Sequence, residues 1–382
     1  MKRKDLTKDI DIIAEQLQID RLSVIEAFKD SLEFGCKKEH DVKSCRVEIN
    51  EDKAELNVFK QYLVIDIENI NFEYDKKFDT IDIKDAKKIK PRIEIGDILE
   101  IEINPNEFGP TAAGGTKIRF NERLAKRQKE ILFERYRNLE GEIITATVIG
   151  VEQITLEANK QTKGEEDTSQ DPQKNYRLDI GHDLTTKLVS REALINDNFQ
   201  VGDRVKVLVT STTSDNKKIT VYVSRKNPKL VEKLLEATVP ELKDGTIEIM
   251  GIARDPGDRT KIALKSNNPQ VEAIGACIGE AGIRIRSVKK ELNGENIDLF
   301  KYSDNERELI ANSLKPAEVI AVTQVNPIEN SATAIVRDDQ LSLAIGKQGQ
   351  NVRLAVQTIN WKIDIKSQSQ AEQLGIIFHH EK

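Results

Sequence analysis

Two stretches of the chain are near-copies of each other: IGEAGIRIR at residues 278–286 and IGKQGQNVR at residues 345–353. Both follow the pattern I-G-x-x-G-x-x-[IV]-R, and their first glycines, Gly279 and Gly346, are 67 residues apart. A short echo follows each copy, Ile-Asp-Leu at 297–299 and Ile-Asp-Ile at 363–365. Because a solenoid needs at least three repeats, the duplication predicts two tandem modules of one fold.

Each copy places its glycine pair between two helical patterns, with an arginine four positions after the second glycine. A glycine pair alone is a weak signal, but duplicated in this setting it is the signature of the KH module, an RNA-binding fold. Without Cβ atoms the loop lets a nucleic-acid backbone come close, and the next helix offers its N-terminal amides to phosphates. Nucleotides would be clamped along the loop while their bases meet an adjacent groove. Two helix–turn–helix connections without a ligand are the alternative.

Basic residues gather beside both loops although the whole chain is acidic, with 59 Lys and Arg against 65 Asp and Glu. Residues 279–290 carry four basic side chains against Glu280, and residues 346–353 carry Lys347 and Arg353 without an acid. Nucleic-acid binding depends on such local charge, whereas net charge governs solubility. Because Glu280 stands where a cation would help, the second loop is the stronger candidate for phosphate contacts.

A strand–turn–strand over residues 254–261, RDPGDRTK, could add backbone contacts through Arg254 and Arg259, with an ordinary charged hairpin as the alternative. Gln350 and Asn351 can offer amide hydrogen bonds to RNA, with helix capping as the alternative. We therefore expect RNA to be bound by the two loops, their basic neighbours and this hairpin. The expected set is Gly279, Glu280, Ala281, Gly282, Arg284, Arg286, Lys289, Arg254, Arg259, Gly346, Lys347, Gln348, Gly349, Gln350, Asn351 and Arg353.

Residues 139–227 contain short β-rich runs at 143–151, 176–180, 205–209 and 219–223, separated by polar turns. This pattern predicts a small barrel of the OB type. OB surfaces usually stack bases on aromatic side chains, but the aromatic residues of this segment are Tyr176, Phe199 and Tyr222. A spacer role is therefore favoured over direct RNA contact. Residues 159–175 are polar and predict a mobile loop.

The first 138 residues predict a mixed domain that begins with two helices and ends in a long basic one. Residues 6–17 have helical spacing, Asp20 can cap a second helix, and Gly35 is expected just past the end of that helix. Strand-like runs follow at 45–50, 54–67, 78–83 and 98–103. The long helix is expected over 117–137, with eight basic residues against three acids. Just before it, GPTAAGGTK at 109–117 has Gly115 where a phosphate loop needs lysine, and predicts a turn.

Other classes of protein are disfavoured. No run approaches 18 apolar residues and no signal-peptide core follows the basic start, so we expect a cytoplasmic protein without a membrane span. The cysteines Cys36, Cys45 and Cys277 cannot form a disulfide framework, and we expect buried or idle thiols. No HExxH, GxSxG or GxGxxG occurs, and residues 338–339, a pair of aspartates, are expected to start a helix. We expect no catalytic residue, no metal and no cofactor.

Further segments resemble the NusA family of bacterial transcription elongation, termination and antitermination factors. Besides the two loops they are VGDRVKV (201–207), VSR (223–225), VPE (239–241), ARDPGDRTKIA (253–263), GACIG (275–279) and AIGKQGQNVRLA (344–355). The match is strong over residues 200–366. Residues 1–138 match mainly in pattern, with Phe108-Gly109 before the long helix.

The resemblance implies an α+β multidomain chain: an N-terminal α/β domain with a long linker helix, an OB-fold β-barrel, and two tandem type II KH domains of α-β-β-α-α-β order. Residues 1–138 would form the RNA-polymerase-binding domain and residues 139–227 the barrel, of the ribosomal S-one type. The KH domains are expected at 228–305 and 306–376, followed by a tail at 377–382.

The resemblance also implies a non-enzymatic factor that binds RNA polymerase and nascent single-stranded RNA, and so modulates pausing, intrinsic termination and antitermination. It further implies other antitermination factors as partners and no binding to a membrane. We expect the protein to be a monomer. Acidic C-terminal repeats of some family members have no counterpart in the sequence, so we expect no regulation through them. An RNA-processing enzyme and a ribosome-associated RNA-binding protein stay open as alternatives, because both use KH and OB modules.

Overall fold

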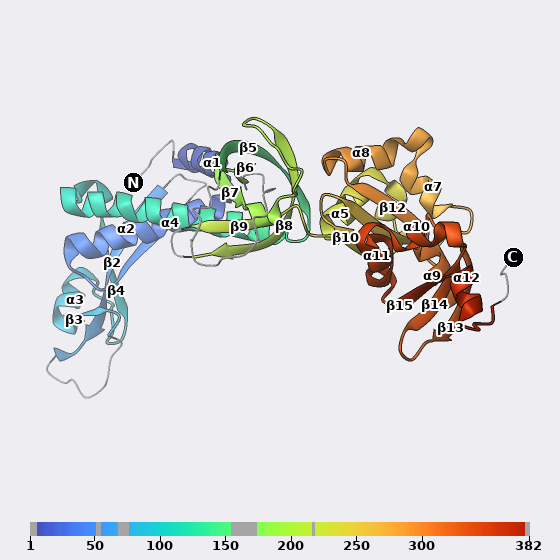
Figure 1. Ribbon diagram of the computed structural model, residues 1–382. Helices are drawn as coiled ribbons and strands as arrows, with labels where there is room; N and C mark the ends of the chain where they lie inside the picture. Colours follow the sequence, from blue (N-terminus) through green and yellow to red (C-terminus); the bar gives the residue numbers. More distant parts are fainter. Residues whose placement is uncertain (1–5, 51–54, 68–75, 154–173, 216–217, 379–382) are drawn as a thin grey trace, which may run out of the picture. The chain divides into compact units, whose positions relative to one another are not determined.

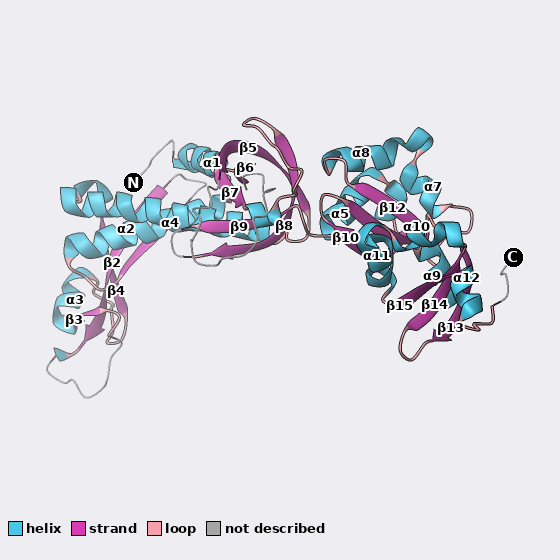
Figure 2. Ribbon diagram, viewed as in Figure 1, coloured by secondary structure: helices cyan, strands magenta, loops and turns pink. Residues whose placement is uncertain are grey.

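The structure is a computed structural model that describes residues 6–50, 55–67, 76–153, 174–215 and 218–378 (Figure 1). Its contacts divide the chain into two compact units, Met1–Arg135 and Tyr136–Lys382. Figure 2 shows helices and strands in both units, which confirms the expected mixed multidomain class.

The first unit packs helices on a four-stranded sheet in which β2 is central. β2 pairs antiparallel with β1 and β4 and parallel with β3. As predicted, Asp20 caps the second helix by accepting a hydrogen bond from the Ser23 amide at 2.8 Å. The elements are α1 (Leu6–Leu17), α2 (Arg21–His40), β1 (Cys45–Asn50), β2 (Glu55–Ile65), β3 (Asp79–Asp82), α3 (Ile83–Ile89), β4 (Ile98–Ile103), a 3-10 turn (Pro105–Glu107) and α4 (Pro110–Arg137).

Two glycines expected outside helices lie inside them. α2 continues past Gly35, and α4 begins at Pro110, so residues 110–116 are helical rather than a turn. A Cβ on Gly35 would overlap the side chain of Thr116 on α4, and one on Gly115 would lie 3.1 Å from the Phe34 ring on α2. The glycines therefore allow close packing of the two helices, and this tertiary contact outweighs their poor helix propensity.

Two further expectations for the first unit were wrong. The strand expected over 78–83 ends at Asp82, whose carboxylate accepts a hydrogen bond from the Lys84 amide and caps α3, a helix the sequence did not reveal.

Cys36 and Cys45 form a disulfide between α2 and the start of β1, because the left-handed turn at Asp41 reverses the chain between them. The expectation of an idle thiol holds for Cys277, which is buried; burial raises its pKa to about 12.

The second unit begins with the predicted barrel. Its strand order is β7-β6-β5-β8-β9, and the two edges meet where the Thr186 hydroxyl on β7 donates to the Val221 carbonyl on β9. Alternate side chains such as Val148, Leu178 and Val207 fill the interior. Most of the polar stretch 159–175 lies outside the described residues, although its last two residues belong to β6. The elements are β5 (Ile143–Gln153), β6 (Lys174–Gly181), β7 (Leu184–Leu188), a 3-10 turn (Ser190–Glu192), β8 (Arg204–Ser214) and β9 (Ile219–Ser224).

The rest of the second unit contains one α-β-β-α-α-β fold twice, as the duplicated sequence predicts. In each copy the first two strands are antiparallel and the third is parallel to the second. The first copy comprises α5 (Lys229–Thr238), α6 (Pro240–Lys243), β10 (Ile247–Asp255), β11 (Arg259–Ser266), α7 (Ala273–Ile278), α8 (Ile283–Glu291) and β12 (Asn296–Lys301). The second comprises α9 (Glu306–Ser313), β13 (Val319–Asn326), β14 (Ser331–Val336), a 3-10 turn (Asp338–Gln340), α10 (Leu341–Ile345), α11 (Gln350–Ile359), β15 (Lys362–Ser367) and α12 (Gln368–Gln373).

Candidate nucleic-acid interface

The two glycine loops have the same backbone conformation. Gly279 has φ 74° and ψ 172°, and Gly346 has φ 77° and ψ 170°, a region open essentially to glycine alone. Ala281 and Gln348, each third in its loop, are both left-handed. The second glycines, Gly282 and Gly349, share a φ of 74° and are the N-cap residues of α8 and α11. The sequence pattern thus encodes one fixed turn, used twice.

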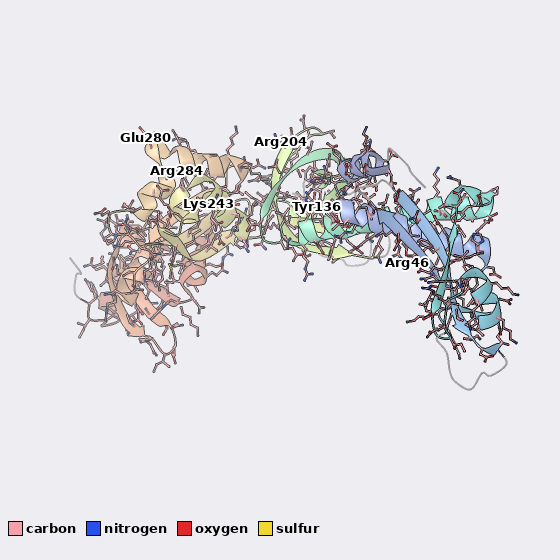
Figure 3. All side chains as sticks on the ribbon, turned by 180° about the vertical axis from the view of Figure 1, so that it is seen from behind. Arg46, Tyr136, Arg204, Lys243, Glu280 and Arg284 are labelled. Atoms are coloured by element: carbon pink, nitrogen blue, oxygen red, sulfur yellow. A yellow bond between two sulfur atoms is a disulfide. The ribbon has the colours of Figure 1, made fainter. Side chains whose placement is uncertain are left out.

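The middle of each loop faces solvent. Glu280, Ala281, Lys347 and Gln348 are exposed. Figure 3 shows Glu280 at the outer edge of the first copy, with Arg284 and Lys243 further inward. A Cβ on Gly349 would meet nothing within 4 Å, so there is open space where the loop turns into α11. A ligand can therefore reach the loop backbone.

Three cations beside the loops are free for a ligand. The side chains of Arg286, Lys290 and Lys347 are exposed and form no ion pair or hydrogen bond with any residue that the structure describes. Lys289 is half-buried and donates a single hydrogen bond, to Asn296 Oδ1 at 3.1 Å. The first copy therefore carries its free charge on α8, whereas the second carries it in the loop itself.

The arginines of the strand–turn–strand have other partners. Arg254, at the end of β10, has a side chain that is 0% exposed, and its Nε and Nη2 each lie 2.8 Å from the Glu295 carboxylate. Its Nη1 donates to the carbonyls of Arg225 and Asn227. Arg259 pairs with Asp298 at 2.6 Å. The expectation that Arg254 contacts an RNA backbone is corrected, because its guanidinium is enclosed in the protein.

One position, five residues after the first glycine of each loop, serves helix capping in both copies. Asn351 is 1% exposed, and its Nδ2 donates to the carbonyls of Ala344 and Leu314 at 2.9 and 3.0 Å. At the matching position, Arg284 donates to the Ala276 carbonyl at 2.8 Å and pairs with Glu241. The capping alternative therefore holds for Asn351, which is enclosed and unavailable to RNA.

Gln350 and Arg353 point away from the second loop toward the first copy. Both side chains bind Asp255, and Gln350 also reaches Asp258, so these two residues join the copies. Sequence reasoning assigned them to RNA because the acidic partners lie more than 90 residues away in the chain.

A second buried ion pair joins the barrel to the first copy, and the sequence did not reveal it. Arg225, which follows β9, pairs with Asp197 through two hydrogen bonds of 2.8 and 3.0 Å, and neither side chain is more than 1% exposed. Arg225 also donates to the carbonyl of Glu291 at the end of α8, and Asn293 donates to Asp197 at 2.7 Å. The barrel and the first copy are therefore cross-linked through shared polar groups.

The barrel offers little aromatic surface for bases. Tyr176 is buried and packs edge-on against Phe199, and Phe199 in turn lies under the Arg225 guanidinium. Tyr222 is 50% exposed and is the one aromatic side chain of the described barrel residues that faces solvent to this extent. OB surfaces usually stack several bases on aromatic side chains. The described residues of this barrel do not offer several exposed aromatic side chains for that purpose.

Two negative findings concern the described residues. No helix among them is long and apolar enough to cross a membrane. No cluster of three or more His, Cys, Asp or Glu side chains among them could hold a metal ion.

Comparison with known proteins identifies the family. The family model of the NusA-like first KH domain matches residues 225–302, that of the NusA-like second KH domain residues 306–373, and that of the NusA N-terminal domain residues 5–130. The transcription termination/antitermination protein NusA of Bacillus subtilis (strain 168) is 33% identical over 373 residues, which are 97% of this chain and 93% of that protein. The chain belongs to the NusA family. The NusA proteins of Halalkalibacterium halodurans and Thermus thermophilus are 34% and 31% identical, over 94% and 89% of this chain and 87% and 84% of theirs.

Family membership gives the two copies their names. They are the first and second KH domains of a NusA protein, and the loops 279–282 and 346–349 are their glycine loops. The loops were found from sequence because their glycine spacing is local. The residues that join the domains have no local signature, and the structure was needed to find them.

Proposed function

We propose that this NusA-family chain is a non-enzymatic transcription factor that binds RNA polymerase and nascent single-stranded RNA. By holding the emerging strand, it modulates pausing, intrinsic termination and antitermination, alone or with other antitermination factors. The observation that carries the proposal is the pair of solvent-facing glycine loops with closely matching backbone dihedral angles in a chain of this family. We assign polymerase binding to residues 1–138 and RNA binding to the KH domains at 228–305 and 306–376.

Single-stranded RNA is the ligand that fits the loops. A KH loop clamps about four nucleotides through their backbone while the unstacked bases are read beside it. The exposed glycine loops supply the backbone approach, and the cations Arg286, Lys289, Lys290 and Lys347 supply charge. The barrel at 139–227 serves mainly as a spacer, because its aromatic residues are largely enclosed.

RNA binding should depend strongly on salt. If these four cations each neutralise one phosphate, the logarithm of the affinity should fall with the logarithm of salt concentration at a slope of roughly −0.7 × 4, about −3. Fluorescence anisotropy with a labelled single-stranded RNA between about 50 and 200 mM KCl measures this slope. A duplex of the same sequence is the control and should bind more weakly. Binding that does not change with salt contradicts the proposal.

Binding to RNA polymerase should require the first unit. Met1–Arg135 is a compact unit with its own sheet and helices, and the family model of the NusA N-terminal domain matches it. We expect immobilised residues 1–138 to retain core polymerase, and residues 139–382 to retain much less. Equal capture by the two fragments would place the polymerase contact elsewhere and contradict the assignment.

A further inference from the structure

Asp255 of the first KH domain binds the helix that begins at the second glycine loop. Arg353 Nη1 donates to Asp255 Oδ1 at 3.0 Å and Arg353 Nη2 to Asp255 Oδ2 at 2.7 Å, a bidentate pair. Gln350 Nε2 donates to Asp255 Oδ2 at 2.9 Å and to Asp258 Oδ2 at 2.5 Å. Asp255 thus accepts three hydrogen bonds from α11, and its side chain is 21% exposed.

These contacts lie at the end of α11 that adjoins the loop. Gln350 is the first residue of α11 and directly follows Gly349, the last residue of the second glycine loop. Other contacts hold the second domain farther from the loop: Gly251 of β10 passes so close to Thr358 that a Cβ would overlap the Thr358 carbonyl oxygen. The Lys261 amine donates to the Lys315 carbonyl at 2.8 Å. Among the contacts of the described residues named here, those of Asp255 and Asp258 with Gln350 are therefore nearest to the second loop, and Asp255 alone also binds Arg353.

We propose that Asp255 is a positioning residue for RNA binding by the second KH domain. Through Gln350 and Arg353 it fixes the start of α11, and with it the loop 346–349, relative to the first domain, so that one RNA strand meets both loops in register. This inference rests on the proposed function, since it concerns how the two RNA-binding loops are held. Asp255 touches no RNA in this proposal.

The proposal predicts an effect opposite in sign to simple electrostatics. Removing an acid near an RNA-binding loop, and so freeing Arg353 for a phosphate, should tighten binding if charge alone decides. If Asp255 positions the loop, removing it should weaken binding, because two sites linked flexibly have a lower effective concentration for one strand than two sites held in register. The loss should appear only with RNA long enough to reach both loops.

The test measures the affinity of full-length wild-type and Asp255→Asn chains for unstructured single-stranded RNAs of about 4 to 16 nucleotides, since one loop clamps about four. We expect equal affinities for the shortest RNA and about fivefold weaker binding of the longest by Asp255→Asn, with an unchanged salt slope because no phosphate contact is lost. Asp304→Asn is the matched control: it removes the same charge from the first domain but breaks only the exposed pair with Lys265. It should not weaken binding at any length.

Arg353→Gln breaks the same ion pair from the other side and gives a second readout that survives if Asp255→Asn folds poorly. Where all variants fold, the two changes also form a double-mutant cycle. If both residues act through their mutual contact, the double variant should bind long RNA about as weakly as either single one. The inference is overturned if Asp255→Asn binds long RNA as tightly as wild type or more tightly. It is also overturned if the losses of affinity in the two single variants add up in the double variant. A wild-type chain that binds RNA of no length overturns the proposed function itself.

Discussion

Replacing Lys347 and Gln348 with aspartate should weaken binding of single-stranded RNA about 30-fold, roughly 2 kcal/mol. Both side chains are exposed in the middle of the second glycine loop, and the Lys347 amine has no partner among the described residues. The change lowers the charge of that loop by three units, since a cation becomes an anion and an amide becomes a second anion. Anisotropy titrations at fixed salt measure the loss.

The first loop supplies the matched control. Replacing Glu280 and Ala281 with aspartate creates the same G-D-D-G sequence on the same backbone turn, but it lowers the charge by one unit only. We therefore expect a loss of less than about fivefold there. Equal losses at the two loops would show that the second is not the dominant phosphate contact, and would contradict the ranking drawn from Glu280 and Lys347.

Glu295→Ala should destabilise the second unit by about 3–5 kcal/mol, the range for removing one partner of a buried ion pair. Glu295 and Arg254 both have side chains that are 0% exposed. Glu295 also accepts hydrogen bonds from the Gly257 amide and the Thr260 hydroxyl. Alanine would leave Nε and Nη2 of Arg254 and these two donors without their acceptor in the interior.

Urea unfolding measured by far-UV circular dichroism and by the fluorescence of Trp361, the only tryptophan of the chain, gives the free energy of unfolding. Glu291→Ala is the control, because Glu291 is a half-buried neighbour whose carboxylate pairs with Lys206 at 3.4 Å. Its loss should cost less than about 1 kcal/mol. A Glu295 variant as stable as the Glu291 variant would show that the Arg254 pair contributes little.

The fold of the second unit could be predicted from sequence because its signals are local. The glycine loops require a conformation that few other residues adopt, and the strand runs of the barrel alternate with polar turns. The duplication then made each copy a check on the other. The same reasoning succeeded for the Asp20 cap, where the carboxylate and the amide that it accepts from are three residues apart.

These ion pairs could not be predicted because the two partners of each are distant in sequence. Arg353 and Asp255 are 98 residues apart, and Arg254 and Glu295 are 41 apart. A basic residue near a glycine loop looks the same whether it faces a phosphate or a carboxylate of the neighbouring domain. Arg254 and Arg353 were therefore both assigned to RNA. In the fold the Arg254 guanidinium is enclosed, whereas Arg353 pairs with Asp255 and its side chain stays 53% exposed.

In the first unit, tertiary packing overrode local preference. Glycine is a poor helix former in short peptides, yet here Gly35 and Gly115 permit α2 and α4 to pack closely. The disulfide between Cys36 and Cys45 was missed because counting cysteines can indicate a framework of several disulfides but not a single one. Whether this one forms depends on how the chain turns after α2.

Where Gly251 passes Thr358, main chain lies against main chain, so the tandem has no hinge at that point. Two domains held rigidly to each other do not adapt to an RNA strand, so the strand must adopt the conformation that fits both of them. A flexible single strand adopts such a conformation at a small entropic cost, whereas the two strands of a base-paired stem must first separate. Under the proposed function, the tandem would therefore favour a flexible single strand of RNA over a base-paired stem.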